Sequence, residues 1–264
     1  MEFGVLGALH VVPPDGDPVV VGGPRLRVLL AVLLWQANQP VPMDELAELV
    51  WDGSPPAGEA EATRALVMRL RRMLGPEAGE RIRTRAPGYL IELSDDELDV
   101  SRAEALSREA AAAVRNGRWA QAADQAARAL RLWRGMPLAD VPSQSLRDRW
   151  LPYLEQLQVQ ALEWRIEADL HEGRHEQLIT ELRGVASRYP LRERFHEQLM
   201  LALALTGRRA EALAAYHDAR RVLVDDLGIE PGPDMRALHK RILAGDWPRS
   251  PNCAGCCRRA SGDT

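Results

Sequence analysis

The hydrophobic pattern divides the chain into a first part of short strands and helices and a second part that is helical throughout. In the first part, short apolar runs bounded by turn residues predict three strands, at 3–9, 10–12 and 18–21. The nearly all-apolar stretch 25–36 predicts a buried helix, and 44–51 predicts a second helix whose leucines face inward. A rigid Gly-Ser-Pro-Pro loop at 53–56 then precedes a third helix.

This third helix, expected over 60–75, has two sharply different faces. At about 100° per residue, one arc of the helix is apolar, and it comprises Ala62, Thr63, Leu66, Val67, Leu70, Met73 and Leu74. The opposite arc comprises Arg64, Met68, Arg71 and Arg72, with Arg69 at its edge. Arginine forks bind guanine edges and phosphates, so this helix suits the DNA major groove. The alternative is a solvated helix in an arginine-rich protein.

A β-hairpin is expected after the third helix. Residues 81–85 and 89–93 alternate around the turn Ala86-Pro87-Gly88. A small sheet, three helices and a terminal hairpin form the order of a winged helix-turn-helix, in which the third helix enters the major groove. Arg85 at the hairpin tip, the wing, is then a candidate contact to the minor groove or a phosphate.

The second part contains a repeat of helix pairs. An acidic stretch at 94–99 marks the junction, and Gly117, Gly173 and Gly207 each lie between two amphipathic helices. Gly173 and Gly207 are 34 residues apart, which is the tetratricopeptide period, and Gly117 lies 56 residues before Gly173. The extra 22 residues indicate an ordered excursion around 134–142. Such helical stacks usually present a groove for another polypeptide.

These patterns predict a fold and its divisions. We expect an α+β winged helix-turn-helix domain with a small antiparallel sheet at 1–94, followed by an all-α tetratricopeptide-like domain at 101–245. Residues 246–264, rich in Pro, Gly, Ser and Arg, are expected to form a disordered tail.

Charge distribution supports a localised contact with nucleic acid. The whole chain has a net charge of −4, but residues 60–88 contain seven arginines and three glutamates, a local charge of +4. No signal peptide is evident, and the longest apolar run, 28–35, is too short to span a membrane. The three cysteines, at 253, 256 and 257, cannot cross-link a core. We therefore expect a cytoplasmic, nucleoid-associated protein.

Two motifs suggest a metal but have simpler interpretations. His171-Glu172-Gly173-Arg174-His175 matches the zinc-protease pattern, yet its glycine falls at an expected turn between helices, which would separate the two histidines. Cys253, Cys256 and Cys257 lack a fourth ligand nearby and are expected to be exposed thiols of the tail. No phosphate-binding loop, dinucleotide fingerprint or catalytic triad is recognisable. We predict no enzyme, no metal and no cofactor.

Seven stretches of the chain match one family of proteins: FGVLGAL (3–9), LLAVLLWQAN (29–38), LVWDGSPP (49–56), RLRRMLG (69–75), RTRAPGYLIEL (83–93), LRLWRGMPLADV (130–141) and the long run 190–243. On these stretches the chain resembles the Streptomyces antibiotic regulatory proteins in their short form, which join an OmpR-like winged helix to a bacterial transcriptional activator domain. The resemblance implies an activator of a secondary-metabolite gene cluster that binds direct repeats near the promoter −35 region and recruits RNA polymerase through its sigma factor. Direct repeats also fit two protomers arranged head to tail on DNA.

Taken together, the sequence gives two sets of candidate contact residues. The DNA-binding set comprises Arg64, Met68, Arg69, Arg71, Arg72, Arg83, Thr84 and Arg85. Within it, the hypothesis is that Arg64 and Arg71 contact base edges, while Arg69, Arg72 and Arg85 hold phosphates. The polymerase-contact set is the loop Gly53, Ser54, Pro55, Pro56 and Ala57, whose alternative role is a plain rigid connector.

Several alternatives remain open from sequence. Glu61 either interacts with the helix dipole or accepts a hydrogen bond from a cytosine, and Met68 either contacts a thymine methyl group or only packs. At the level of function, the rivals are an interaction scaffold that does not bind DNA and a repressor that makes the same DNA contacts.

Overall fold

The computed structural model describes residues 1–14, 16–54 and 56–245, and these form two compact units. The first unit comprises residues 1–112 and 124–162, and the second comprises 113–123 and the described residues from 163 onward. None of the described helices is long and apolar enough to cross a lipid bilayer.

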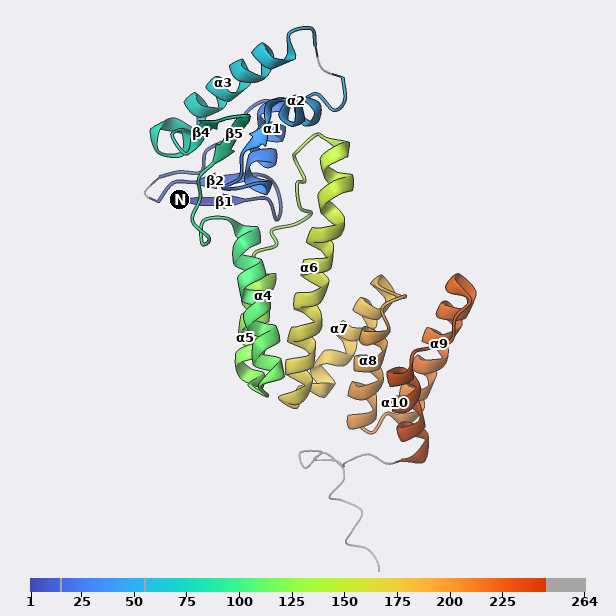
Figure 1. Ribbon diagram of the computed structural model, residues 1–264. Helices are drawn as coiled ribbons and strands as arrows, with labels where there is room; N and C mark the ends of the chain where they lie inside the picture. Colours follow the sequence, from blue (N-terminus) through green and yellow to red (C-terminus); the bar gives the residue numbers. More distant parts are fainter. Residues whose placement is uncertain (15, 55, 246–264) are drawn as a thin grey trace, which may run out of the picture. The chain divides into compact units, whose positions relative to one another are not determined.

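The first unit has the element order of a winged helix followed by the beginning of a helical array (Figure 1). Its strands are β1 (Glu2–Gly4), β2 (His10–Val12), β3 (Val41–Pro42), β4 (Ile82–Arg85) and β5 (Gly88–Ile91). Its helices are α1 (Pro24–Trp35), α2 (Met43–Val50), α3 (Glu59–Gly79), most of α4 (Asp99–Arg115), the end of α5 (Trp119–Leu130) and the first part of α6 (Gln144–His171). The predicted fold class is thereby confirmed.

Two small antiparallel sheets support the helices. In one, β1 pairs with β2, placing Phe3 opposite Val11. In the other the order is β3-β5-β4, so β5 is the central strand. All four residues of β5 are buried, which differs from the expected alternation of buried and exposed positions. A central strand that is covered on both faces loses this alternation.

Two of the predicted strands differ from the structure. The stretch 18–21 forms no strand and shows a single backbone bond to β2, from Val19 N–H to the Val11 carbonyl (2.8 Å). The predicted strand at 3–9 is limited to β1, because the N–H groups of Val5 and Leu6 donate to the carboxylate of Asp99 instead of to a neighbouring strand.

Helix α1 forms the centre of the core in this unit. Leu29 to Leu34 are all fully buried, as the all-apolar pattern predicts. Helix α3 is regular up to Gly75, whose φ of 76° and ψ of 180° are not helical and which is followed by Pro76. The residues after this break turn back along α3 and lead into β4.

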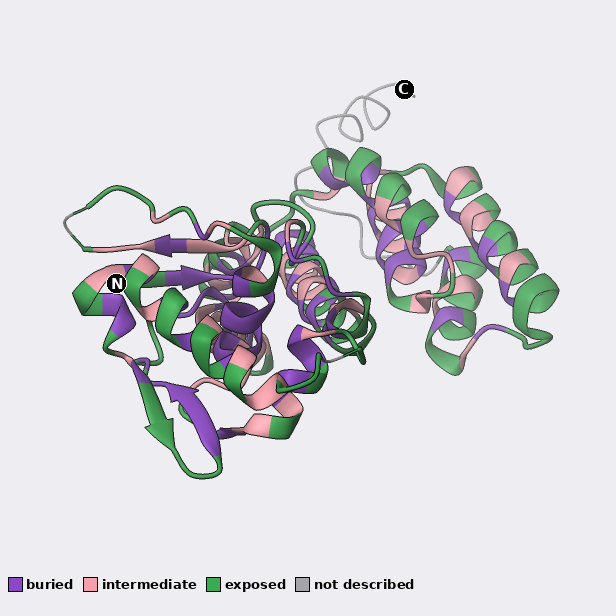
Figure 2. Cartoon of the chain, turned by 90° about the horizontal axis from the view of Figure 1, so that it is seen from above, coloured by how far each residue is buried: buried purple, intermediate pink, exposed green. Residues whose placement is uncertain are grey.

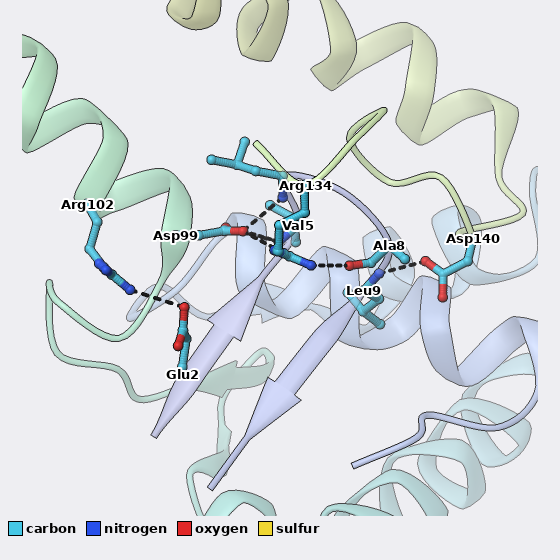
Figure 3. Close-up of polar contacts among 9 residues, drawn as sticks. Glu2, Val5, Ala8, Leu9, Asp99, Arg102, Arg134 and Asp140 are labelled. Atoms are coloured by element: carbon cyan, nitrogen blue, oxygen red, sulfur yellow. Dashed lines mark hydrogen bonds and ion pairs between the residues drawn. The ribbon is translucent and has the colours of Figure 1, made fainter. Parts of the chain in front are cut away.

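A single buried carboxylate joins the β1–β2 loop to α4 (Figure 3). Asp99 is 2% exposed and accepts hydrogen bonds from Val5 N–H and Leu6 N–H, each at 3.0 Å. The Nη2 atom of Arg134 donates to the same carboxylate at 2.9 Å. A Cβ at Gly4 would lie 2.2 Å from Arg134 Nη2 and 2.6 Å from Asp99 Oδ2, so a larger residue there would have to displace this ion pair. Asp99 therefore holds the N-terminal strand pair against the helical array.

The excursion predicted around 134–142 is ordered and binds the same loop. Arg134 N–H donates to the Leu6 carbonyl (2.8 Å), and Leu138 N–H donates to the Val5 carbonyl (3.0 Å). In the reverse direction, Leu9 N–H donates to the Asp140 carboxylate at 2.7 Å (Figure 3). The 22-residue departure from the repeat thus supplies partners for backbone groups of the N-terminal loop.

The first part of helix α6 packs against α1 and α2. Trp35 and Trp150 stack with ring centroids 4.7 Å apart and an interplanar angle of 13°. Arg149 also forms an ion pair with Glu45 of α2 at 3.5 Å. One hydrophobic core consequently includes residues from the winged helix and from α4 and α6.

The second unit contains α7 (His175–Arg188), α8 (Glu193–Leu205), α9 (Arg209–Leu227) and α10 (Pro233–Ala244), together with the end of α4, the start of α5 and the end of α6. The three predicted turn glycines, Gly117, Gly173 and Gly207, have φ of 66°, 82° and 78°. After each, an arginine N–H donates to a carbonyl five residues earlier, at 2.8–3.0 Å, as in Arg208 to Leu203. A left-handed residue at the helix end favours glycine, so the repeat in sequence is a repeat of one turn geometry.

We expect Asp99→Asn to destabilise the protein by roughly 3 kcal/mol, because it leaves the buried Arg134 contact and backbone N–H donors without their charged acceptor. The measurement is the free energy of unfolding from chemical denaturation. Glu2→Gln is the control, because it breaks the exposed Glu2–Arg102 pair and should cost less than about 1 kcal/mol. Equal effects of the two substitutions would contradict the role given to Asp99.

The second unit should lose stability in mild acid. Burial lowers the pKa of His196 below its usual 6.5, although the Pro190 carbonyl, Glu193 and Asp218 oppose this shift. Burial also lowers the pKa of His175 and His239. Below pH 6.5 these histidines become protonated in the unfolded chain more readily than in the folded one, so unfolding takes up protons. The free energy of unfolding is therefore highest above pH 6.5 and declines as the pH falls below it.

Thermal unfolding at several pH values between 7.5 and 5.5, as measured by circular dichroism, tests this expectation. His196→Gln keeps an N–H donor for Pro190 but does not titrate, so its melting temperature should depend less on pH than that of the wild type. An identical pH dependence in both proteins would exclude His196 as a contributor.

Candidate nucleic-acid interface

Helix α3 separates its side chains as its sequence predicts. Thr63, Val67, Leu70 and Leu74 are buried against α1 and α2, and Leu66 and Met73 are half-buried. Arg64, Met68, Arg69 and Arg72 are exposed on the other face. Met68 is 56% exposed, which is unusual for a large apolar side chain.

The guanidinium groups of four arginines of this region make no hydrogen bond or ion pair with the part of the chain that the structure describes: Arg64, Arg69, Arg72 and Arg85. Many of the other described arginines have a carboxylate within reach, such as Arg81 with Glu97 at 2.5 Å. The free guanidinium groups therefore concentrate positive charge on α3 and the hairpin tip, where an anionic ligand would find unneutralised donors.

Arg71 differs from the other arginines of α3. It is half-buried, and its Nε and Nη2 atoms donate to the Ile82 carbonyl at 3.0 and 2.7 Å. Nη2 also donates to Thr84 Oγ1 at 3.2 Å, and the guanidinium lies 5.6 Å from the centre of the Tyr89 ring. The structure thus places this predicted base contact on the hairpin of its own domain.

The β4–β5 hairpin presents one exposed strand and one buried strand (Figure 2). Arg83, Thr84 and Arg85 of β4 are exposed, and Arg83 forms a surface ion pair with Glu92 at 3.2 Å. Gly88 begins β5, and a Cβ there would lie 1.9 Å from the Val41 carbonyl. Glycine is required at this position because β3 and β5 approach so closely.

A groove of about 630 Å³ lies between the C-terminal half of α3 and β4. Its lining includes Met68, Arg71, Arg72, Arg83 and Thr84. The structure therefore brings five of the eight predicted DNA-binding residues to one concave surface.

On the opposite flank of α3, Arg69 lines a smaller pocket with Arg25 at the start of α1. The guanidinium of Arg25 lies 4.0 Å above the Trp51 ring, which fixes its position. Sequence reasoning did not identify Arg25, because its partner is distant in sequence. The sequence signal for Arg25 was its position in the first turn of a helix, directly after Gly22-Gly23-Pro24.

The loop between α2 and α3 is held at its beginning by α6. Asp52 accepts hydrogen bonds from Ser143 Oγ (3.4 Å) and Ser145 Oγ (2.5 Å). Of the predicted polymerase-contact set, Gly53, Ser54, Pro56 and Ala57 are exposed, and Pro55 lies outside the described residues. The loop is thus displayed on the surface and fixed at one end.

The two histidines of the zinc-protease pattern lie on different helices. His171 ends α6 and His175 begins α7. The His171 ring stacks on Trp119 with centroids 3.6 Å apart, and its Nε2 lies 3.5 Å from Glu167. No group of three or more His, Cys, Asp or Glu side chains that could hold a metal occurs among the described residues. The three cysteines lie outside them.

A winged helix with an arginine-rich third helix, followed by a helical array, defines a class of bacterial transcriptional regulators. Family models agree with this architecture: residues 17–91 match the transcriptional regulatory protein C-terminal domain, and 98–243 match the bacterial transcriptional activator domain. The chain belongs to the Streptomyces antibiotic regulatory protein family. Proteins of this family are transcriptional regulators, and the OmpR-like domain implies DNA binding.

Several relatives cover nearly the whole chain. Over 93% of its own length, this chain is 39% identical to the regulatory protein AfsR of Streptomyces coelicolor. It is 32% identical to the regulatory protein DnrI of Streptomyces peucetius, also over 93% of this chain. A solved structure of EmbR from Mycobacterium tuberculosis, in complex with a low affinity phosphopeptide, matches with a TM-score of 0.88 and 34% identity over 94% of this chain.

These relatives differ in length. The chain spans 24% of AfsR and 65% of the EmbR chain in the structure, but 93% of DnrI. The family models meet between residues 91 and 98, whereas the first compact unit continues through that stretch to include α4 and part of α6.

Proposed function

We propose that this protein is a DNA-binding transcriptional activator of a secondary-metabolite gene cluster, and that it acts in the cytoplasm on nucleoid DNA. The observation that carries this proposal is the set of four arginines on α3 and the hairpin tip whose guanidinium groups have no partner among the described residues. Free guanidinium groups on an exposed helix face supply the phosphate contacts that dominate affinity for DNA. Family membership supplies the expectation of activation.

In the proposed complex, α3 lies in the major groove and β4 with the hairpin tip forms the wing. Arg69 and Arg72 lie on opposite flanks of α3, one beside the start of α1 and the other beside β4. The two phosphate backbones that border a major groove run along these flanks, so each arginine is assigned to a backbone. Arg83, Thr84 and Arg85 of the wing are assigned to the neighbouring phosphates or minor groove.

Base recognition is assigned to the exposed centre of the helix face. Arg64 has free donors for a guanine edge, and Met68, one turn later, presents an apolar side chain suited to a thymine methyl group. Glu61 lies in the first turn of α3, where its negative charge interacts favourably with the positive end of the helix dipole.

Assembly on the promoter is the second part of the proposal. Two protomers would bind direct repeats near the −35 region as a head-to-tail homodimer, with sites about one helical turn apart. The loop Gly53 to Ala57 would contact RNA polymerase holoenzyme through its sigma factor, since it is exposed and fixed by the bonds of Asp52 to Ser143 and Ser145.

A binding experiment separates the arginines that read bases from those that hold phosphates. A duplex selected from a random pool by the wild-type protein is compared with a scrambled duplex in gel-shift titrations at several salt concentrations. Arg64→Ala should cost about 1–3 kcal/mol on the selected duplex and little on the scrambled one. Arg72→Ala should weaken both and reduce the slope of log affinity against log salt by about 1.

Equal losses on both duplexes for Arg64→Ala would contradict its role in base recognition. If the wild-type protein showed no salt-dependent binding to any duplex, the interaction scaffold would replace the DNA-binding protein as the interpretation.

A transcription experiment tests the role proposed for the α2–α3 loop. Pro56→Glu and Ala57→Glu place a charge on an exposed loop and should leave DNA affinity unchanged. Transcription from a promoter with the selected site should fall roughly tenfold, which corresponds to about 1.4 kcal/mol of lost contact with polymerase. The readout is in vitro transcription with purified holoenzyme. Unchanged activation by both variants would identify the loop as a connector. If the wild-type protein did not activate transcription, the repressor would be the favoured interpretation.

A further inference from the structure

We propose that Arg71 is a positioning residue that holds the wing at a fixed distance from α3, and that it does not contact bases. This inference rests on the proposed function, because it assigns a role within the DNA-binding surface. It differs from the sequence-based hypothesis, in which Arg71 contacts a base edge together with Arg64.

The first argument is that the donors of Arg71 are already used. Nε and Nη2 both donate to the Ile82 carbonyl, and Nη2 also reaches Thr84 Oγ1. The remaining Nη1 lies 3.9 Å from Met68 Sδ. A bidentate contact to guanine needs two adjacent free N–H groups. Arg71 would have to release the Ile82 carbonyl to offer Nε with Nη2, or Thr84 Oγ1 to offer Nη1 with Nη2.

The second argument is the position of the acceptor. β4 is an edge strand, and Glu92 N–H donates to the Arg81 carbonyl at 2.9 Å on the side that faces β5. Successive carbonyls of a strand point to opposite sides, so the Ile82 carbonyl points to the open edge of β4. Arg71 therefore supplies the hydrogen bond that a further strand would otherwise make.

The third argument is what this bond controls. Arg83, Thr84 and Arg85 all lie on β4, within three residues of Ile82. Between α3 and β4 the chain passes through the non-helical Gly75 and Pro76, so the helix itself does not dictate where β4 begins. The Arg71 guanidinium spans this break and touches both strands of the hairpin, through Ile82 on β4 and Tyr89 on β5.

Two substitutions at this position separate positioning from charge. In Arg71→Gln the amide nitrogen occupies the place of Arg71 Nε, so one donor to the Ile82 carbonyl is kept while the charge is lost. Arg71→Met has a similar length but neither donor nor charge. Arg64→Ala is the matched control on the same helix face, since Arg64 has no partner among the described residues.

The experiment uses the full-length chain, the selected duplex and the scrambled duplex, with gel-shift titration and hydroxyl-radical footprinting of both strands. Arg71→Met should lose roughly tenfold in affinity for both duplexes, comparable to one lost charged hydrogen bond, and should lose the protection at one end of the footprint that Arg85→Ala also loses. Arg71→Gln should retain that protection. Arg64→Ala should retain it as well, while losing sequence preference.

Coupling between the two arginines gives an independent readout. If Arg71 acts through the wing, adding Arg85→Ala to Arg71→Met should lower the affinity for DNA only slightly. The same Arg85→Ala substitution in the wild type should lower that affinity much more. Circular dichroism checks that each variant is folded. If Arg71→Met does not fold, the test rests on Arg71→Gln.

Three outcomes would overturn the proposal. Relaxed preference at one base pair with full wing protection in Arg71→Met would make Arg71 a base reader. Equal loss of wing protection in Arg71→Gln and Arg71→Met would assign the effect to charge, as would additive losses with Arg85→Ala. A wild-type protein that bound neither duplex would instead refute the proposed function, which is a distinct result.

Discussion

The carboxylate of Asp99 is the constraint on which the architecture of the first unit depends. It lies at the first residue of α4, is 2% exposed, and is bound by two backbone N–H groups of the β1–β2 loop and by Arg134. A buried charge is tolerated only when its acceptor sites are filled, and here the β1–β2 loop and the excursion before α6 fill those of α4. The winged helix and the start of the helical array consequently share one core.

The arginines near α3 illustrate how identical side chains acquire different roles from their surroundings. Arg64, Arg69 and Arg72 project from the helix without partners among the described residues, whereas Arg71, on the same face, is occupied by the open edge of β4. An edge strand presents unpaired carbonyls, and a guanidinium fork is well matched to such an acceptor. DNA binding therefore depends on how far the unpaired arginines extend and on how firmly the paired one holds the wing.

The helical array, which comprises α4 to α10, is built on one repeated kind of turn. Its turns repeat one geometry at Gly117, Gly173 and Gly207, so its helix pairs are built alike despite the 22-residue departure in the first repeat. That departure is used structurally, because it provides backbone and carboxylate partners for the β1–β2 loop. The relatives AfsR and EmbR continue well beyond the length of this chain, whereas DnrI is of similar length, so this two-part core is shared among regulators of different size.

The sequence by itself determined the features that arise from local periodicity. The two faces of α3, the buried α1, the hairpin and the three glycine turns each follow from spacing within a few turns of chain, and the structure agrees. Tertiary structure alone decided the rest. The strand at 3–9 ends at Gly4 because a carboxylate 94 residues away takes the N–H of Val5. β5 is buried throughout as a central strand covered on both faces, and its neighbour β3 was not revealed by the sequence. Likewise, the role of Arg71 depends on a carbonyl direction that only the sheet order establishes. Periodicity specifies which face of an element is apolar, but hydrogen-bond partners distant in sequence exist only once the chain has folded.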